Sequence, residues 1–457
     1  MSRHALKYSA LFALAAAAPL ATAAFAAPAV TLNGGGAASQ EFDYAAPDVS
    51  GTPVSEMSLY NAGQSRVSFG TYWSTISGAA QAAMLTDDLT CLENKVTGAN
   101  GGNCSGTLIG GADTVHYGVS ESVFNSTQIA TWATSSVGQT AAGDLIQIPA
   151  MGTGLAIVVN DTNVTNNNQI GFSDNDLCGI FSGLITDFSQ ITDSSPDAPA
   201  AGQFKLVYRS DTAGNTFSLT NHLAAVCNAG NTNAGVTFTV TSTFSSLFPG
   251  GVVTSKIPNA VGVSGLANLA NTMAGLDGGS YPQAISYISP DWTSVDSATS
   301  SAKLSNGEPS PLTVASLYNG TTLFLPTTTN IAAALKHPTL GSDLTPPTNA
   351  TQGANPALWV PIIQTASTGY PIVSYSVLEL PQCYASKTVR KGMIGFLKDH
   401  YGNSSYKTIQ SNNGLVSVAD SGATKFLAAI KANILANAND WDTNIGNATE
   451  CTGKAGR

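Results

Sequence analysis

The chain has 457 residues and a formal net charge of −10, and only 10% of its residues are charged. Its length exceeds that of a usual single domain, and a hydrophobic fraction of 43% can form a large core, so we expect two domains. The acidic balance argues against nucleic acid as a partner. It also means that any anion site must rest on local N–H groups, helix ends and a buried arginine, not on the field of the whole protein.

The first residues predict a signal peptide. Arg3, His4 and Lys7 precede an apolar run at residues 10–20, and small residues follow that suit cleavage after Ala26. The apolar run is too short to span a bilayer comfortably. We therefore treat residues 1–26 as a signal peptide outside the fold, and expect a mature charge of −12 because Lys+Arg falls from 18 to 16 against 28 Asp+Glu.

No membrane anchor is expected in the mature chain. The first cysteine is Cys91, so the acylated cysteine of a lipoprotein is absent near the cleavage site. No later stretch is long and apolar enough for a membrane helix. These features predict a periplasmic or secreted protein without membrane insertion.

Six cysteines in an exported chain predict disulfide bonds. They are Cys91, Cys104, Cys178, Cys227, Cys383 and Cys451. Because no Cys-x-x-Cys pair occurs and histidine is scarce, we expect no structural zinc site. Pairing neighbours in the sequence is the simplest connectivity, 91–104, 178–227 and 383–451, although six cysteines allow fifteen pairings.

Strand-like and helix-like runs alternate, which predicts an α/β fold. Four times, a strand-like run passes through a turn of small or hydroxyl residues into a helix. These turns lie at residues 33–40, 77–78, 118–122 and 210–216. Each presents unpaired backbone N–H groups at a helix start, so the four could converge on one ligand. For the first turn a flexible tether is the alternative, because three consecutive glycines follow soon after a cleaved signal.

The fourth turn is the most informative. Residues 206–208 read as the end of a buried strand, and residues 217–226 are apolar at helical spacing. Gly214 lets the backbone approach a ligand closely, and Arg209 adds a fork of charge-assisted donors. This pattern predicts an anion site with Arg209 as its main charged donor. The alternative is a surface Arg209 paired with Asp211 beside an ordinary helix cap.

The remaining elements continue the alternation. Strands are predicted at residues 145–149, 155–159 and 284–289, β alternation at 235–244, and helices within 177–188, 385–401 and 424–436. The Pro-, Thr- and Asn-rich stretch 298–355 gives no firm elements. We place the two crossings between lobes near residues 149 and 371, so lobe 1 comprises residues 27–148 and 371–457, and lobe 2 comprises residues 149–370.

At these positions the chain resembles the phosphate-binding periplasmic proteins of ABC transporters, and within them the DING proteins. The similar segments occur in the same order over most of the mature chain. They are Asn33-Gly-Gly-Gly-Ala37, Asp176 to Phe188, Tyr208 to Thr216, Ile285 to Asp291, Leu358-Trp-Val-Pro361, Gln382-Cys-Tyr-Ala385 and Gly446 to Lys454. The resemblance implies two α/β lobes of the type II periplasmic-binding-protein fold, with mainly parallel sheets and a hinge, that close on one dehydrated oxyanion. It also implies the 178–227 and 383–451 disulfides, with 91–104 as an addition.

The resemblance further implies a ligand set. Carried over residue by residue, this set comprises Ala38, Ser39, Ser77, Glu121, Arg209, Ala213, Gly214 and Asn215, with Asp211 as the partner of Arg209. The chain departs from the family where Ala38, Ala213 and Asn215 replace hydroxyl side chains and Glu121 replaces an aspartate. Three donors are therefore missing, and since an unmade buried hydrogen bond costs about 1–3 kcal/mol, the affinity and the ligand can differ from those of the family.

Glu121 stands where the family has its acidic residue. In a dry pocket a carboxylate accepts only from a ligand that still carries a proton, so Glu121 would favour hydrogen phosphate, or a phosphonate, over sulfate. A solvated glutamate in the first turn of a helix is the alternative.

Three functions follow from these observations. The first is capture of phosphate or a related oxyanion for delivery to an ABC transporter permease. The second is a secreted or surface binding protein with a lost or changed ligand, which the missing hydroxyls and the missing anchor favour. The third is a DING-type phosphatase, which we rank last because histidine is scarce and no metal-ligand spacing occurs. We expect no catalytic residue, cofactor or metal.

Overall fold

Two separate β-sheets form the framework of the protein, whose computed structural model describes most of the chain. The described residues are 30–45, 52–93, 104, 114–161, 163–191, 201–276, 278, 282–295, 302–320, 322–339 and 345–457. The predicted signal peptide and most of the loop between Cys91 and Cys104 lie outside these ranges.

The first sheet has six strands in the order β16-β4-β15-β3-β1-β2. Its strands are β1 (Val30–Ala37), β2 (Val67–Thr75), β3 (Tyr117–Ser120), β4 (Leu145–Gly154), β15 (Val373–Pro381) and β16 (Val416–Ser417). β1 pairs in parallel with both β2 and β3, whereas β15 is antiparallel to β3 and β4, and β16 is antiparallel to β4. Every residue of β4 and of β15 is buried, so these long strands lie in the middle of the core.

The second sheet has five strands in the order β10-β5-β9-β7-β8. Its strands are β5 (Ala156–Asn160), β7 (Lys205–Arg209), β8 (Val261–Val263), β9 (Ala284–Ile288) and β10 (Thr313–Val314). β7 is parallel to β8 and β9, and β5 is antiparallel to β9 and β10. Smaller pairings join β6 (Gly171–Phe172), β11 (Ser316–Tyr318) and β12 (Leu323–Phe324), and join β13 (Pro338–Thr339) with β14 (Thr365–Ala366).

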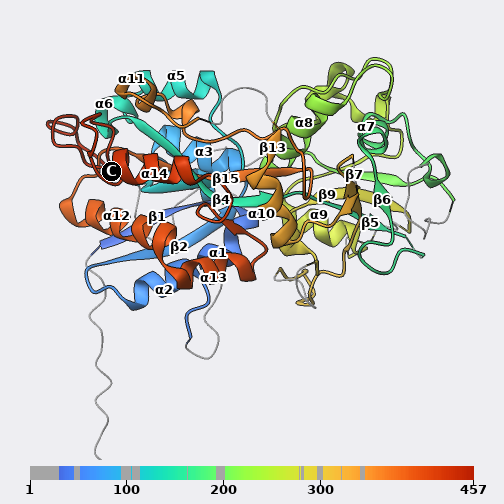
Figure 1. Cartoon of the computed structure of the whole chain (residues 1–457), viewed down its shortest axis with the longest axis horizontal. Helices are drawn as coiled ribbons and strands as arrows, with labels where there is room; N and C mark the ends of the chain where they lie inside the picture. The colour runs from blue at the N-terminus through green and yellow to red at the C-terminus, as the bar shows by residue number, and fades with distance from the viewer. Residues whose placement is uncertain are drawn as a thin grey trace, which may run out of the picture.

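The chain passes from the first sheet to the second at Leu155, between β4 and β5, and returns with β15. The two passes lie side by side, because Leu155 N donates to Ile372 O (3.1 Å) and Tyr370 Oη donates to Leu155 O (2.7 Å). In Figure 1 the blue N-terminal elements and the red C-terminal helices form one lobe, and the green and yellow elements form the other. The exact lobe boundaries stay a prediction.

The expectation of mainly parallel sheets holds for the strands that surround the lobe interface, β1 to β3 and β7 to β9. Both sheets are nevertheless mixed. The reason is the double crossing: β4 carries the chain out of the first sheet and β15 carries it back, so these two neighbours run in opposite directions.

Helices cover both sheets. They are α1 (Glu41–Ala45), α2 (Glu56–Ala62), α3 (Ser77–Thr86), α4 (Thr90–Glu93), α5 (Ser126–Thr134), α6 (Gln139–Ala142), α7 (Asp174–Ser182), α8 (Gly214–Val226), α9 (Leu266–Met273), α10 (Thr328–Lys336), α11 (Ala350–Gly353), α12 (Lys387–Gly402), α13 (Ser404–Asn412) and α14 (Thr424–Asn433). Short 3-10 helices are η1 (Ala38–Gln40), η2 (Phe188–Gln190), η3 (Phe244–Leu247), η4 (Pro249–Gly251), η5 (Val253–Ser255), η6 (Pro290–Trp292) and η7 (Pro356–Leu358).

The β alternation at residues 235–244 does not produce a strand. Val236 and Phe238 are buried, which explains the alternating pattern. The backbone of this segment bonds to helix α8 instead of to a sheet: Thr241 N donates to Thr220 Oγ1 (3.0 Å), and Ala213 N donates to Ser242 O (2.9 Å). The strand prediction for this stretch was therefore wrong.

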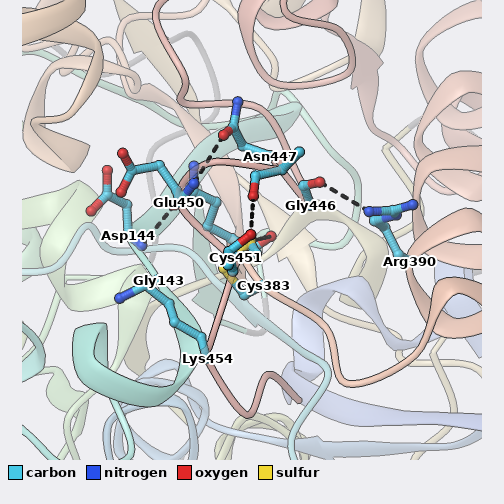
Figure 2. The surroundings of a disulfide bond; sticks show 12 residues. Gly143, Asp144, Cys383, Arg390, Gly446, Asn447, Glu450, Cys451 and Lys454 are labelled. Atoms are coloured by element: carbon cyan, nitrogen blue, oxygen red, sulfur yellow. Dashed lines mark hydrogen bonds between the residues drawn. A yellow bond between two sulfur atoms is a disulfide. The ribbon is translucent and has the colours of Figure 1, made fainter.

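All six cysteines are paired, and the sequential connectivity is confirmed: Cys91–Cys104, Cys178–Cys227 and Cys383–Cys451. Figure 2 shows the third pair, with Arg390 pointing at the tail. Arg390 Nη1 donates to Gly446 O (3.0 Å) and Cys451 N donates to Asn447 O (3.0 Å). The disulfide and the bond from Arg390 fasten the C-terminal tail to the first lobe, and the bond from Cys451 N holds the tail in its own turn.

Candidate anion-binding pocket

The carboxyl ends of parallel strands from both sheets meet at one place. β1 ends at Ala37, β2 at Thr75 and β3 at Ser120 in the first sheet, and β7 ends at Arg209 in the second. Ligands of open α/β sheets bind outside the carboxyl ends of such strands. The residues at and after these four ends line one small common pocket, with a cavity volume of about 10 Å³.

The pocket lies where three helices begin without a side-chain cap. The N-cap residues of α3, α8 and α9 are Ile76, Ala213 and Gly265, and none of them makes a capping hydrogen bond. Away from the pocket, α5 and α7 each begin with a capping box, whereas α6 and α14 also lack a side-chain cap. The uncapped N–H groups and the positive dipole ends of α3 and α8 therefore remain for a bound anion.

Arg209 is the cation of the pocket, and only 4% of it is exposed. Its Nε and Nη2 donate to the two carboxylate oxygens of Asp211 at 2.7 and 2.6 Å, and Gly265 N also donates to Asp211 (3.1 Å). Burial alone would lower the pKa of Arg209, but the charge and hydrogen bonds of Asp211 raise it above its usual value. Nη1 has no hydrogen-bond partner among the described residues, so part of the guanidinium stays available to a ligand.

The pairing of Arg209 with Asp211 was predicted, and the pair lies in the core of the site. Asp211 is 1% exposed, so the alternative of a surface ion pair is wrong. Arg209 N donates to Tyr287 Oη (3.1 Å), and that hydroxyl also bonds Thr216 Oγ1 (2.8 Å). These contacts connect β7 to β9 and to α8 and hold the backbone at Arg209, while Asp211 fixes the direction of the guanidinium.

Glu121 is the carboxyl group of the pocket and is 5% exposed. Burial raises its pKa to about 7, while a hydrogen bond from Ser39 and the charge of Arg209 act in the opposite direction. Its backbone N donates to Ser77 Oγ (3.1 Å), and its Oε2 accepts from Asn215 Nδ2 (3.0 Å). The alternative of a solvated capping glutamate is therefore wrong.

The glycine of the fourth turn is needed for this close approach of the lobes. A Cβ atom on Gly214 would lie 2.3 Å from Glu121 Cβ and 2.7 Å from Ser77 Oγ. Any larger residue would force the start of α8 away from β3 and α3.

Seven of the eight predicted ligand residues line the pocket: Ala38, Ser39, Ser77, Glu121, Arg209, Gly214 and Asn215. Ala213 does not; it is 1% exposed and forms the N-cap of α8. That these residues bind a ligand stays a prediction.

Sequence reasoning missed four lining residues, Ala37, Thr75, Ile76 and Leu266. Ala37 directly precedes Ala38, and Thr75 and Ile76 are the two residues before Ser77. Leu266 begins α9, which follows β8 through Gly265. Residues 261–273 form a fifth case in which a strand passes through a glycine into a helix. This case was not predicted because the strand is only three residues long.

Comparison with known proteins identifies the family. A family model described as a PBP superfamily domain matches residues 63–346, which is more than half of the chain. This chain belongs to the PBP superfamily.

Relatives cover almost the whole chain. A phosphate-binding protein of an unknown prokaryotic organism is 30% identical over 443 residues, covering 93% of this chain and 99% of the relative. Alkaline phosphatase L of Pseudomonas aeruginosa is 30% identical over 441 residues, covering 92% and 93%. The resemblance to phosphate-binding and DING proteins is thereby confirmed.

A solved structure supports the same relationship. A high affinity periplasmic phosphate-binding protein (PfluDING), solved with bound phosphate, superimposes with a TM-score of 0.68 at 28% identity, covering 93% of this chain and 99% of that chain. The two-lobed fold expected for this PBP superfamily member is therefore confirmed.

The described residues also bear on membrane insertion and on metal binding. Among the described residues, no helix combines the length and apolar character needed to span a bilayer. The group of possible metal ligands found there is Asp88, Cys91 and Cys104, and both cysteines are bonded to each other. None of the pocket-lining residues is a histidine.

Proposed function

We propose that this protein is an exported solute-binding protein that captures phosphate, or a closely related protonated oxyanion, in the pocket between its lobes. The observation that carries the proposal is the meeting of the uncapped starts of α3 and α8 with Arg209 in one buried pocket. Together they offer N–H donors and a cation to an anion that has left its water.

The second feature of the proposed binding site is the carboxyl group of Glu121, which distinguishes one tetrahedral anion from another. An ionised carboxylate accepts hydrogen bonds and donates none. Hydrogen phosphate can supply a proton to Glu121, whereas sulfate at neutral pH brings only acceptors and negative charge. Phosphate binding by named relatives supports this reading.

The test is calorimetry on the purified protein after its bound anions have been removed by unfolding and refolding. We expect phosphate to bind and sulfate to bind far more weakly at pH 8. Mass spectrometry of the protein as purified identifies any ligand carried from the cell. Absence of binding to phosphate, phosphonates and sulfate would show instead a family member that has lost its ligand, for which Ala38 and Asn215 in place of hydroxyl residues would be the cause.

A phosphatase activity is the competing function, because several relatives are named alkaline phosphatase L. Hydrolysis would need a nucleophile and a proton donor at the phosphate. The pocket offers Ser39 and Ser77, but Ser77 Oγ already accepts from Glu121 N, and no histidine lines the pocket to activate either hydroxyl. We propose binding without hydrolysis.

Hydrolysis of p-nitrophenyl phosphate, measured with and without added Zn²⁺, Ca²⁺ or a chelator, tests this choice. Turnover that disappears in Arg209→Ala would establish an enzyme at this pocket.

Delivery of the ligand to an ABC transporter permease, and export through the predicted signal peptide, belong to the same proposal. Localisation of the tagged full chain in cell fractions checks the export.

A further inference from the structure

Asn215 and Glu121 meet across the pocket from different lobes. Asn215 lies in the first turn of α8, Glu121 follows β3, and the Nδ2 to Oε2 distance is 3.0 Å. Both side chains are buried, at 3% and 5% exposure. Since an ionised carboxylate only accepts, the amide must turn its NH₂ group toward Glu121, which fixes the orientation of Asn215.

The backbone leaves Glu121 little freedom to avoid this contact. Its N–H is held by Ser77 Oγ, and the start of α8 lies directly against its Cβ at Gly214. The carboxyl group is therefore positioned by its neighbours on both sides of the pocket.

The surroundings of Glu121 leave its charge finely balanced. A hydrogen bond from Ser39 and the charge of Arg209 from β7 favour the ionised form of Glu121. The pKa values of Asp291 in η6 and Tyr72 in β2 are raised mainly by burial, and the charge of Glu121 raises them further. Burial raises the pKa of Glu121 to about 7, so both forms are populated near neutral pH. Each hydrogen bond donated to the carboxylate shifts this balance toward the ionised form, and Asn215 donates one of them.

We propose that Asn215 is a specificity-determining residue, which acts by keeping Glu121 an acceptor and so makes the pocket choose oxyanions that still carry a proton. The inference rests on the proposed anion binding and deepens it. An ionised Glu121 needs a donor from the ligand, and a protonated tetrahedral anion provides one. A neutral Glu121 is itself a donor, and it can then serve a fully ionised anion such as sulfate.

The amide oxygen of Asn215 strengthens the same preference. Asn215 Oδ1 is buried and has no hydrogen-bond partner among the described residues. Leaving a buried acceptor unpaired is unfavourable. The lining thus contains two acceptor groups that a protonated ligand can satisfy better than sulfate can.

The experiment measures phosphate and sulfate affinities of wild type and Asn215→Ala by calorimetry from pH 5 to pH 9. In the wild type, sulfate affinity should rise as the pH falls and Glu121 takes up a proton. In Asn215→Ala this rise should move to higher pH, and the preference for phosphate over sulfate at pH 7 should fall about tenfold or more. In Glu121→Gln the same substitution of Asn215 should leave the preference unchanged, because the effect passes through the carboxyl group.

Ser218→Ala is the matched control. Ser218 lies on the same helix and is also buried, but its hydroxyl bonds Ser374 Oγ (2.9 Å) in the other lobe and not Glu121. This variant should change both affinities by the same factor and leave the sulfate pH profile in place.

The outcomes separate the two proposals. If Asn215→Ala weakens both anions equally and does not move the profile, Asn215 only supports the fold and the inference is overturned. If the wild type binds neither anion, the proposed function fails and the inference fails with it. If Asn215→Ala does not fold, Asn215→Leu replaces it, because leucine keeps the side-chain volume and removes the donor. The phosphate-to-sulfate preference at pH 7 and the pH profile of sulfate affinity then test the inference in the same way.

Discussion

The protein buries two clusters of charged and polar side chains, and they differ in what satisfies them. The pocket cluster consists of Arg209, Asp211, Glu121 and Asn215. The Glu56 cluster consists of Glu56, His400, Gln410 and Asp43, where α1, α2, α12 and α13 pack together. In the Glu56 cluster the carboxylate takes hydrogen bonds from both partners, His400 Nδ1 and Gln410 Nε2, at 2.6 Å each.

The pocket cluster is left incomplete by the protein itself. Arg209 keeps a nitrogen without a partner among the described residues, and the helices beside it lack caps. His400, in contrast, also uses its second nitrogen, with Nε2 bonded to Ala150 O (2.9 Å), and its ring stacks on Tyr44 and Phe396. Both Asp43 oxygens and Gln410 Oε1 in the Glu56 cluster also have no hydrogen-bond partner among the described residues, so unpaired atoms alone do not separate the two clusters. The uncapped helix starts beside Arg209 are what mark the first cluster as the ligand site, whereas the Glu56–His400 bond joins α2 to α12.

The largest expected effect is that of Arg209→Ala on binding. The variant loses the charged donors to the anion and leaves Asp211 buried with fewer partners, and breaking such a buried pair costs about 3–5 kcal/mol. Phosphate affinity should fall by at least about a hundredfold in calorimetry.

Two controls sharpen this result. Arg390→Ala removes an arginine that bonds Gly446 far from the pocket and should leave affinity unchanged. Arg209→Lys keeps the charge beside Asp211 but loses the fork, and should bind weakly while remaining folded. Unchanged affinity in Arg209→Ala would place the anion elsewhere.

His400→Ala should show the opposite pattern. It leaves Glu56 buried without its charged partner, so we expect a loss of about 3–5 kcal/mol in urea unfolding with phosphate affinity retained. Burial lowers the pKa of His400, but the charge and hydrogen bond of Glu56 raise it above its usual value on balance. The stabilisation is therefore complete at low pH and is lost as the pH rises through the folded-state pKa.

The exposed His337 provides the matched control, and His337→Ala should be as stable as the wild type at every pH. If His400→Ala lost phosphate affinity without losing stability, the distinction between the two clusters would break down.

Two disulfides allow a similar comparison with a smaller expected effect, because one is attached to a pocket helix and the other is not. Cys178–Cys227 joins α7 to the end of α8, whose start lines the pocket, and Cys383–Cys451 fastens the tail (Figure 2). Their sequence separations of 49 and 68 are similar, so replacing either pair by alanine should cost a similar amount, about 2–4 kcal/mol. Only the loss of Cys178–Cys227 should also weaken phosphate binding.

Non-reducing peptide mapping of the purified protein checks that both bonds form before the variants are compared. Equal effects of the two replacements on affinity would mean that α8 is positioned by its packing alone.

The difference between the clusters also explains what the sequence could predict. Ser77 begins α3, Arg209 ends β7 and Glu121 follows β3, so the strand ends in the local sequence pattern indicated these residues before any contact was known. The helix predicted to open at residues 118–122 instead begins at Ser126, with Asn125 as its cap. Arg209 and Asp211 are two positions apart, and their pairing could be read directly. The resemblance to the phosphate-binding family added the order of the segments.

The Glu56 cluster gave no such signal. Glu56 and His400 are 344 positions apart, and nothing local marks either residue as buried. The bond between Asn215 and Glu121, 94 positions apart, was missed for the same reason, because it depends on how the two lobes close. The strand prediction at residues 235–244 was wrong because an irregular segment that packs against a helix can also bury every second side chain. The sequence pattern is then the same as that of a strand.

The smallest expected effect concerns the stability of the ligand-free protein and Glu121. Because burial raises the pKa of this carboxyl from 4.5 to about 7 in the folded state, the folded protein binds a proton that the unfolded chain has already released in that range. Stability from this group is present below pH 4.5 and is lost as the pH rises to 7, by up to roughly 3 kcal/mol. Glu121→Gln cannot titrate, so its advantage in unfolding free energy over the wild type should grow from pH 5 to pH 8, whereas the exposed Glu450→Gln should show no such trend. Parallel pH profiles for Glu121→Gln and the wild type would mean that water reaches Glu121, and the carboxyl could then no longer select a protonated anion.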